Sequence, residues 1–334
     1  MSDQHDVVSR RRALLLTGAG VVGYAAACRG SGAGESNAVA ATRPVGSPPT
    51  PAVPPDGVVQ PKEATTMPAL NKMPVAFLPH GGGPWPFADM GFPKSETEPL
   101  AAYLRAVPSL APVPLKALLV ISAHWEEAVP TVMTSPRPPM LYDYYGFPPE
   151  TYQVQWPAPG APELAERVRT LLGAAGFETA VNAERGYDHG TFVPLKLSFP
   201  GADVPTTQLS LKAGLDPAVH VAMGRALAAL RDEGVFILGS GMSYHNMRGF
   251  GDPRAVSHAD AFDGWLRDVV GLPAADRDQR LSTWSQAPSA RVVHPREEHL
   301  LPLMVVAGAA GADLGKVTFR GHVFGKAISG VHFG

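Results

Sequence analysis

The sequence predicts an α/β fold with a largely parallel central sheet, helices on both faces and a single domain. After residue 72, short apolar runs bounded by turn residues alternate with longer segments of helical period, which is the pattern of parallel strands joined by crossover helices. No second linker interrupts residues 73–334, and hydrophobic residues make up 45% of the chain, enough to close a substantial core. We therefore expect one folded domain over residues 73–334.

Short runs rich in β-branched and large apolar residues are the expected strands. They cover residues 75–78, 117–121, 204–211 and 235–238. Two helices are expected between them: Pro162 begins the first and Gly173 is placed to end it, while Asp216 caps the second and Gly234 stops it. Residues 142–159 are dense in aromatics and prolines without a clear period, which predicts a long structured loop of the kind that is often functional.

The N-terminal region predicts export. Residues 1–28 have the layout of a signal peptide of the twin-arginine type, with adjacent arginines before an uncharged run of small and apolar residues. Three alanines before Cys28 resemble a lipoprotein signal, and ordinary cleavage without a lipid is the alternative. Residues 29–72 are rich in Pro, Gly, Ala and Ser, which predicts a disordered tether. We expect an exported protein, periplasmic or otherwise extracytoplasmic, that meets a membrane only if Cys28 carries a lipid.

Charge and cysteine content exclude other classes of function. With 28 basic and 30 acidic residues, the formal charge of -2 attracts neither nucleic acid nor an anionic membrane surface. The single cysteine cannot form a disulfide within the chain, and no Cys-x-x-Cys pair exists to hold a structural zinc. Any metal ion must be held by His, Asp or Glu.

Three histidines lie just after expected strands: His80, His124 and His245. Parallel strands end on the same side of a sheet, and open α/β sheets bind ligands in the crevice beyond those ends. One such histidine is usually an ordinary hydrogen-bonded residue, but three together predict a metal site. His189 is expected beside them as a general acid and base, because imidazole titrates near neutral pH.

The other histidines have weaker signals. His294 and His299 precede the apolar run 300–307, so either a supporting role behind the site or a plain helix N-terminus fits them. The remaining five lie in the leader, on expected helices or near the C-terminus: His5, His220, His258, His322 and His332.

With these residues in place, the domain resembles the class III extradiol ring-cleavage dioxygenases, LigB-like proteins, and most closely their 4,5-DOPA dioxygenase branch. The matching segments include Phe-Leu-Pro-His-Gly-Gly-Gly-Pro (77–84), Val-Ile-Ser-Ala-His-Trp (120–125), Tyr-Asp (142–143) through Gly-Phe-Pro (146–148), Tyr-Asp-His-Gly-Thr (187–191), Gly-Ser-Gly (239–241) through His-Asn (245–246), and His-Pro (294–295) with Glu-His (298–299). They run in family order across residues 73–334.

The resemblance implies metal ligation by His80, His124 and His245, with His189 as the active-site acid and base or a further metal contact. It implies an aromatic diol and O2 as substrates. Two departures bear on substrate preference more than on the ligand set. Three glycines precede Pro84 where many members have His-Gly-Ser-Pro, and Met242 stands where an asparagine is frequent.

The identity of the metal and the reaction have alternatives. Fe(II) suits oxygen-dependent ring opening, but three imidazoles also suit Zn(II), which cannot exchange electrons with oxygen. The rival functions are a zinc hydrolase with Glu126 as base and a binder without catalysis. A serine hydrolase using Ser240 does not match the nucleophile elbow. The candidates to pack on the substrate ring are Trp125, Tyr144, Phe147 and Trp156, for which an aromatic core is an equal reading.

Overall fold

The computed structural model of the protein describes residues 72–89 and 91–334. The predicted signal peptide and nearly all of the predicted tether lie outside the described residues. The strands are β1 (Val75–Pro79), β2 (Ala117–Glu127), β3 (Thr131–Met133), β4 (Ala180–Asn182), β5 (Thr206–Lys212), β6 (Val235–Gly241), β7 (Gly315–Val323) and β8 (Lys326–Phe333). The helices are α1 (Lys94–Ala106), α2 (Pro162–Ala174), α3 (His189–Ser198), α4 (Pro217–Leu227), α5 (Ala255–Val270), α6 (Ala274–Ser282), α7 (Ala290–Val293) and α8 (Leu301–Ala310).

These strands form one mixed sheet in the order β4-β3-β5-β2-β6-β1-β8-β7. Its centre is parallel, because β2 pairs with both β5 and β6, and β6 pairs with β1, all in the same direction. The C-terminal hairpin β7–β8 adds to β1 antiparallel, and β3 adds to β5 antiparallel at the other side. The prediction of a largely parallel α/β sheet is confirmed, with antiparallel strands added at both sides.

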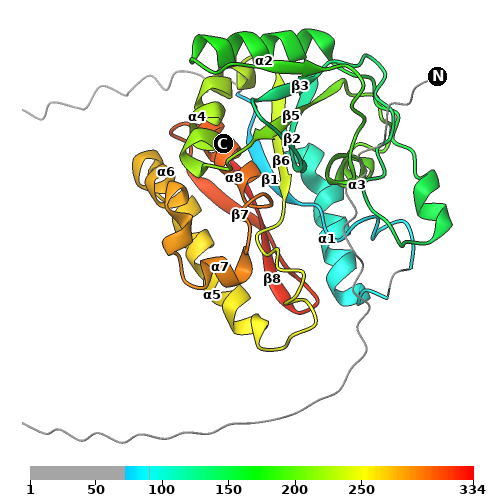
Figure 1. Cartoon of the computed structure of the whole chain (residues 1–334), viewed down its shortest axis with the longest axis vertical. Helices are drawn as coiled ribbons and strands as arrows, with labels where there is room; N and C mark the ends of the chain where they lie inside the picture. The colour runs from blue at the N-terminus through cyan, green and yellow to red at the C-terminus, as the bar shows by residue number, and fades with distance from the viewer. Residues whose placement is uncertain (1–71, 90) are drawn as a thin grey trace, which may run out of the picture. The chain divides into compact units, whose positions relative to one another are not determined.

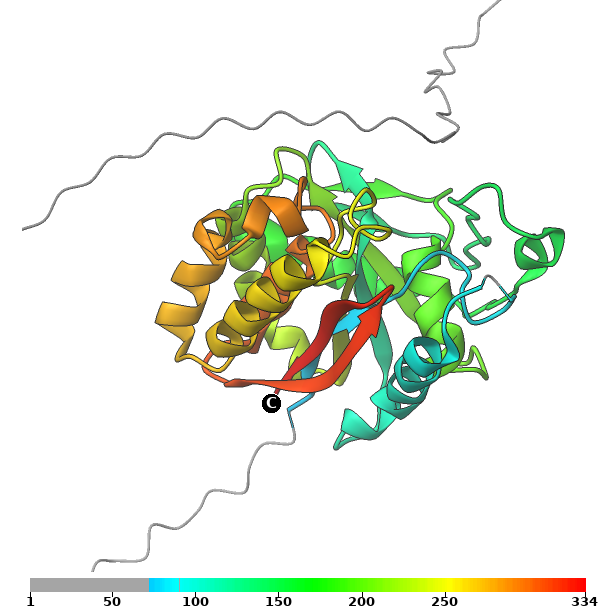
Figure 2. The ribbon, with the colours of Figure 1, turned by 90° about the horizontal axis from the view of Figure 1, so that it is seen from below.

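Helices cover both faces of the sheet (Figure 1). On one face α3 packs on β2 and β6 with α1 beside it, and on the other α8 packs on β6, β1 and β2 beneath α4. The central strands are buried from both sides, which explains why they read as continuous apolar runs instead of alternating ones. Figure 2 shows the C-terminal hairpin running beside α5, in agreement with the contacts between α5 and β8.

The central helix α8 is buried at every position, and small residues let α4 approach it closely. A Cβ atom at Gly308 would lie 2.0 Å from the Val221 carbonyl oxygen, and one at Gly224 would lie 2.0 Å from the Val305 carbonyl oxygen. Each helix therefore uses glycine where the backbone of the other comes nearest. This packing fixes α8 against the sheet and, with it, the segment that precedes the helix.

Two strands extend by three or more residues beyond their predicted ends, and both extensions matter for the site. β6 continues through Gly241, so the expected loop at 239–241 is strand. β2 continues to Glu127 with a register irregularity between Ile121 and Glu126, so His124 lies within the strand and not after it. Such irregularities often re-aim a side chain next to an active site.

The predicted helix ends were also shifted. Gly173 lies inside α2, which ends at Ala174, and Gly176 is the residue with a positive φ of 86° after it. The second helix is regular only to Leu227 and then tightens into a 3₁₀ turn before Gly234. Within the part of the chain that the structure describes, no helix combines the length and apolar character needed to cross a membrane.

Candidate active site

Five histidines from distant parts of the chain line one cavity of about 290 Å³ beyond the carboxyl end of the parallel sheet. They are His80, His124, His189, His245 and His299. His80 directly follows β1 and His245 lies four residues after β6, and these strands end level with each other because Pro79 pairs with Gly241. His189 is the first residue of α3, and His299 lies two residues before the start of α8. The predicted convergence of histidines is confirmed, with His299 added.

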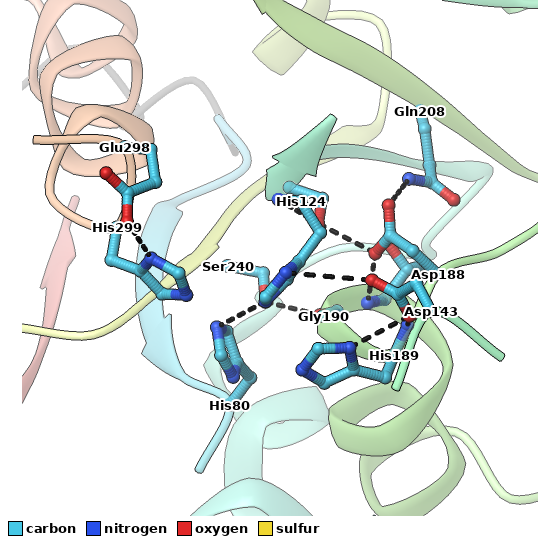
Figure 3. Close-up of polar contacts among 12 residues, drawn as sticks. His80, His124, Asp143, Asp188, His189, Gly190, Gln208, Ser240, Glu298 and His299 are labelled. Atoms are coloured by element: carbon cyan, nitrogen blue, oxygen red, sulfur yellow. Dashed lines mark hydrogen bonds and ion pairs between the residues drawn. The ribbon is translucent and has the colours of Figure 1, made fainter. Parts of the chain in front are cut away.

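His80 and His124 face each other through their Nε2 atoms, which are 3.3 Å apart (Figure 3). His80 Nδ1 donates to the Gly81 carbonyl oxygen at 2.8 Å, which leaves Nε2 as the lone-pair nitrogen. Asp143 Oδ2 lies 3.6 Å from His124 Nδ1 and favours a proton on that nitrogen too. Two lone pairs then point at the same space, an arrangement that a cation between or beside them stabilises.

Burial keeps these imidazoles neutral. Desolvation, with the neighbouring His189 and His245 adding to it, lowers the pKa of His80 to about 3. Desolvation first, and then the surrounding histidines, hold the pKa values of His124 and His299 well below their usual range. Metal ions bind the neutral imidazole, so this environment suits metal binding near neutral pH.

His245 and His299 form a stacked pair, with ring centroids 3.3 Å apart and an angle of 17° between the planes. Both Nδ1 atoms lie near Glu298 Oε1, at 3.2 Å for His245 and 3.0 Å for His299. A carboxylate behind the ring orients metal-ligating histidines and fixes their tautomer. His299 Nε2 is buried and has no hydrogen-bond partner among the residues that the structure describes.

Among the described residues, three overlapping sets of side chains could hold a metal ion, and the donor atoms of each set lie within 4.8 Å of one another. They are His80 with His124 and His299, His124 with Asp143 and His189, and His245 with Glu298 and His299. The structure therefore brings His299 within this distance of His80 and His124, while His245 groups with His299 and Glu298. All three predicted ligands still line the same cavity.

His189 is held by Asp143, not by the carboxylate next to it in sequence. Asp143 Oδ1 accepts from both the backbone nitrogen and Nδ1 of His189, at 2.8 and 2.9 Å (Figure 3). Burial alone would raise the pKa of Asp143, but the hydrogen bonds and charge of His189 outweigh it and lower that pKa. With Nδ1 bound to the carboxylate, Nε2 of His189 is the nitrogen that can take up a proton. This is the arrangement of a general base whose ring is oriented by a carboxylate.

A family model described as the catalytic LigB subunit of aromatic ring-opening dioxygenase matches residues 75–331, which is most of the chain. This chain belongs to the LigB family. The chain is also similar to a 4,5-DOPA dioxygenase extradiol of Beta vulgaris, at 42% identity over 59% of this chain and 74% of that protein. It is 38% identical to the dioxygenase tasH of Hapsidospora irregularis, over 72% of this chain and 79% of that protein.

A solved structure agrees with these relationships. The crystal structure of an uncharacterised protein from Escherichia coli K12 matches with a TM-score of 0.64 and 29% identity, covering 79% of this chain and 100% of that one. Together with the family match, the related dioxygenases identify the chain as an extradiol ring-opening dioxygenase.

Asp188 has a structural role in this LigB-family site. It caps α3 by accepting from the Thr191 backbone nitrogen and also accepts from the side chains of Ser122, Arg185 and Gln208 (Figure 3). These bonds tie the start of α3 to β2 and β5, the strand beside it. They position His189 and His124 through the backbone, without touching either imidazole.

Several residues proposed from the sequence have other roles in the dioxygenase. Ser240 is buried in β6 and its hydroxyl donates to the Gly190 carbonyl oxygen, so it is not placed as a nucleophile. Glu126 is paired with Arg296 and does not line the cavity. Trp125 packs under Arg185, and Trp156 is fully buried with its indole nitrogen bonded to the Phe199 carbonyl oxygen. Of the four aromatic candidates, Tyr144 and Phe147 line the cavity.

Sequence reasoning missed the functional importance of two carboxylates and placed His299 only as an intermediate candidate. Asp143 lies in the aromatic loop 142–159, more than forty residues from the histidine it holds. Glu298 adjoins His299 just before α8. Both carboxylates lie within the quoted family motifs, but only the tertiary structure shows which imidazole each one reaches.

Proposed function

We propose that this dioxygenase opens a catechol-type ring next to its two hydroxyl groups, using O2 and Fe(II). We propose His80, His124 and His245 as the metal ligands, with His299 as a further candidate, and His189 as the acid and base. The observation that carries the proposal is the pair of facing Nε2 atoms of His80 and His124, which lie 3.3 Å apart on two residues that line the cavity.

The donor set fits a metal ion. The pair of neutral imidazoles and the partnerless His299 Nε2 offer nitrogen ligands in a buried place, and Asp143 and Glu298 stand behind the rings as orienting carboxylates. When bound, Fe(II) would supply the electrons and the open coordination positions that O2 chemistry requires. Zn(II) suits the same imidazoles but cannot supply electrons, so activity depends on which metal is loaded.

The protein's own residues would bind and deprotonate the diol. His189, held through Nδ1 by Asp143, takes a proton from a catechol hydroxyl at Nε2, and the negative Asp143 stabilises the imidazolium that forms. Tyr144 and Phe147 on the cavity wall offer aromatic faces to the catechol ring.

The test is O2 uptake by protein loaded anaerobically with Fe(II), followed together with absorbance for a yellow ring-opened semialdehyde. The related proteins named 4,5-DOPA dioxygenase make DOPA one necessary member of the substrate panel. We expect uptake and colour with Fe(II) and neither with Zn(II) at equal metal content. Equal turnover with Zn(II) would contradict a mechanism that needs electrons from the metal.

We propose further that the protein is exported through the signal at residues 1–28. The support is the sequence pattern alone, since these residues lie outside the described part of the chain. Fractionation of cells that express the full chain, compared with Arg11→Lys/Arg12→Lys, tests it. Export that is unaffected by the arginine changes would exclude the twin-arginine route.

A further inference from the structure

The wall of the cavity outside the histidines is made of apolar side chains and glycine. It consists of Gly81, Gly82, Gly83, Phe92, Tyr144, Phe147, Met242, Met247, Phe250, Val323 and Phe324. Met247 and Phe324 are exposed at 71% and 42%, so the apolar wall continues outward to solvent. Among the described residues lining the cavity there is no Arg, Lys, Asp or Glu side chain.

The basic side chains of the neighbouring segments are already bound by other groups of the protein. Arg185 is paired with Asp188 and packs on Trp125, and Arg296 is paired with Glu126. The Lys326 ammonium group is 3.0 Å from each of two backbone carbonyl oxygens, those of Phe250 and Phe324, and the residue is 3% exposed.

Arg248 adjoins Met247 in sequence but lines a different groove, with Asp252 and Arg254. No cation among these four residues is therefore offered to a carboxylate inside the cavity. A substrate carboxylate entering it would lose its hydration without gaining an ionic partner.

Two carboxylates stand directly behind the histidines of the cavity. Asp143 stands behind His189 and His124, and Glu298 stands behind His245 and His299. Their negative charges favour a cation at the centre of the histidine cluster and do not favour an additional anion beside it. A substrate with a charged carboxylate on its ring is therefore opposed by the apolar wall, and neither of these carboxylates offers it a partner.

The run of three glycines, where this chain departs from the family pattern, lets two aromatic rings of the wall pack closely on the backbone. Gly83 has a φ of +55°, and a Cβ atom there would lie 2.9 Å from Phe147 Cζ. A Cβ atom at Gly82 would lie 3.2 Å from Phe92 Cζ. Without side chains at these positions, both rings pack against the backbone directly after His80. Met242, the other departure, places its sulfur 3.3 Å from the Gly81 backbone nitrogen, where it adds no charge.

From this wall we infer that the substrate is a catechol whose ring substituent is uncharged and apolar, such as an alkyl or aryl group. The inference rests on the proposed function and deepens it by naming the substrate class. The diol lies toward the histidines and the substituent lies against Phe147, Met247 and Phe324. Catechols that carry a carboxylate, an amino acid group or an ammonium group are poorer substrates.

The test compares kcat/KM of the Fe(II)-loaded full chain for 4-propylcatechol, protocatechuate, DOPA and dopamine. We expect 4-propylcatechol to exceed each charged catechol by at least about thirtyfold, because a charged group loses its hydration against this wall without a partner. Lengthening the chain from methyl to propyl should raise kcat/KM by roughly fourfold for each methylene, which corresponds to about 0.8 kcal/mol. A preference for DOPA or protocatechuate would overturn the inference, and a preference for dopamine would show that the aromatic wall recognises a cation.

A matched pair of variants places the substituent. Met247→Arg puts a cation on the exposed part of the wall, and we expect it to raise kcat/KM for protocatechuate by about tenfold and to lower that for 4-propylcatechol. Leu314→Arg changes an exposed apolar residue that does not line the cavity, and we expect both values to stay as in the unchanged protein. An unchanged preference in Met247→Arg would overturn the placement.

Binding without turnover separates this inference from the proposed function. Calorimetric titration of the metal-free full chain under anaerobic conditions should give tighter binding for 4-propylcatechol than for protocatechuate. Tighter binding of 4-propylcatechol without O2 uptake from any catechol would refute the proposed reaction and support the preference for apolar catechols. Ring opening with a preference for charged catechols would support the proposed reaction and refute the apolar substrate class.

Discussion

Replacing Asp143 by asparagine tests the pairing that makes His189 a base. Asp143 Oδ1 accepts two hydrogen bonds from His189, at 2.8 Å from the backbone nitrogen and 2.9 Å from Nδ1. An asparagine oxygen can accept the same bonds, but without the negative charge that orients the ring and stabilises its protonated form. The variant thus removes charge while keeping the size of the side chain.

The expected loss follows from the difference between the two kinds of bond. A hydrogen bond to a charged group contributes about 1 kcal/mol more than one between neutral groups, so two bonds give about 2 kcal/mol. We expect kcat with 4-propylcatechol, or with the best catechol found, to fall by about thirtyfold. KM should change little, because the diol and its ring do not contact Asp143 in the proposed arrangement.

The assay combines steady-state O2 uptake from pH 5 to 9 with metal content measured after anaerobic loading and desalting. We expect metal content to stay at that of the unchanged protein, and the pH profile to shift because the base has lost its carboxylate. Asp216→Asn is the matched control, since it makes the same chemical change at a helix cap where asparagine serves about equally well. Loss of metal in Asp143→Asn would refute the reasoning, because it would make Asp143 a ligand in the group with His124 and His189.

Three further predictions concern the metal, pH and processing. His80→Ala should abolish metal binding, and His245→Ala should weaken it more than His299→Ala does; the reverse order in calorimetric metal titrations would make His299 the third ligand. Desolvation first lowers the pKa of His294 to about 3, so the stability that this neutral ring contributes is complete above its ordinary value near 6.5 and is lost as pH falls toward 3. In metal-free protein, His294→Phe should therefore reduce the pH dependence of the unfolding free energy by up to about 1.4 kcal/mol per pH unit. Urea unfolding at pH 5 and pH 6 measures this dependence, and the same change of unfolding free energy with pH in both proteins would contradict the prediction. Mass spectrometry of the exported chain should show a lipid on Cys28 if it is a lipoprotein, and a start beyond Cys28 would exclude the lipid.

The core of the sheet was predictable from local sequence because its strands are buried on both faces. Residues 75–78 and 235–238 read as unbroken apolar runs, and such runs occur where helices cover a parallel sheet from both sides. The two sides of the sheet were harder, because β4 and β3 have only three residues each and β7 alternates between less and more exposed positions. Short or half-exposed strands depend on pairing with neighbours that are distant in sequence.

The sequence alone predicted that His80, His124 and His245 meet in one place, because they lie at or near the ends of parallel strands and those strands end on one side of the sheet. Tertiary structure decided how they are paired. Asp143 reaches His189 from a loop without periodicity, while Asp188, next to His189 in sequence, caps α3 instead. His299 enters the cluster because the buried helix α8 packs against β6 and β1. Contacts of this kind depend on the close packing of several elements, which no local pattern of residues encodes.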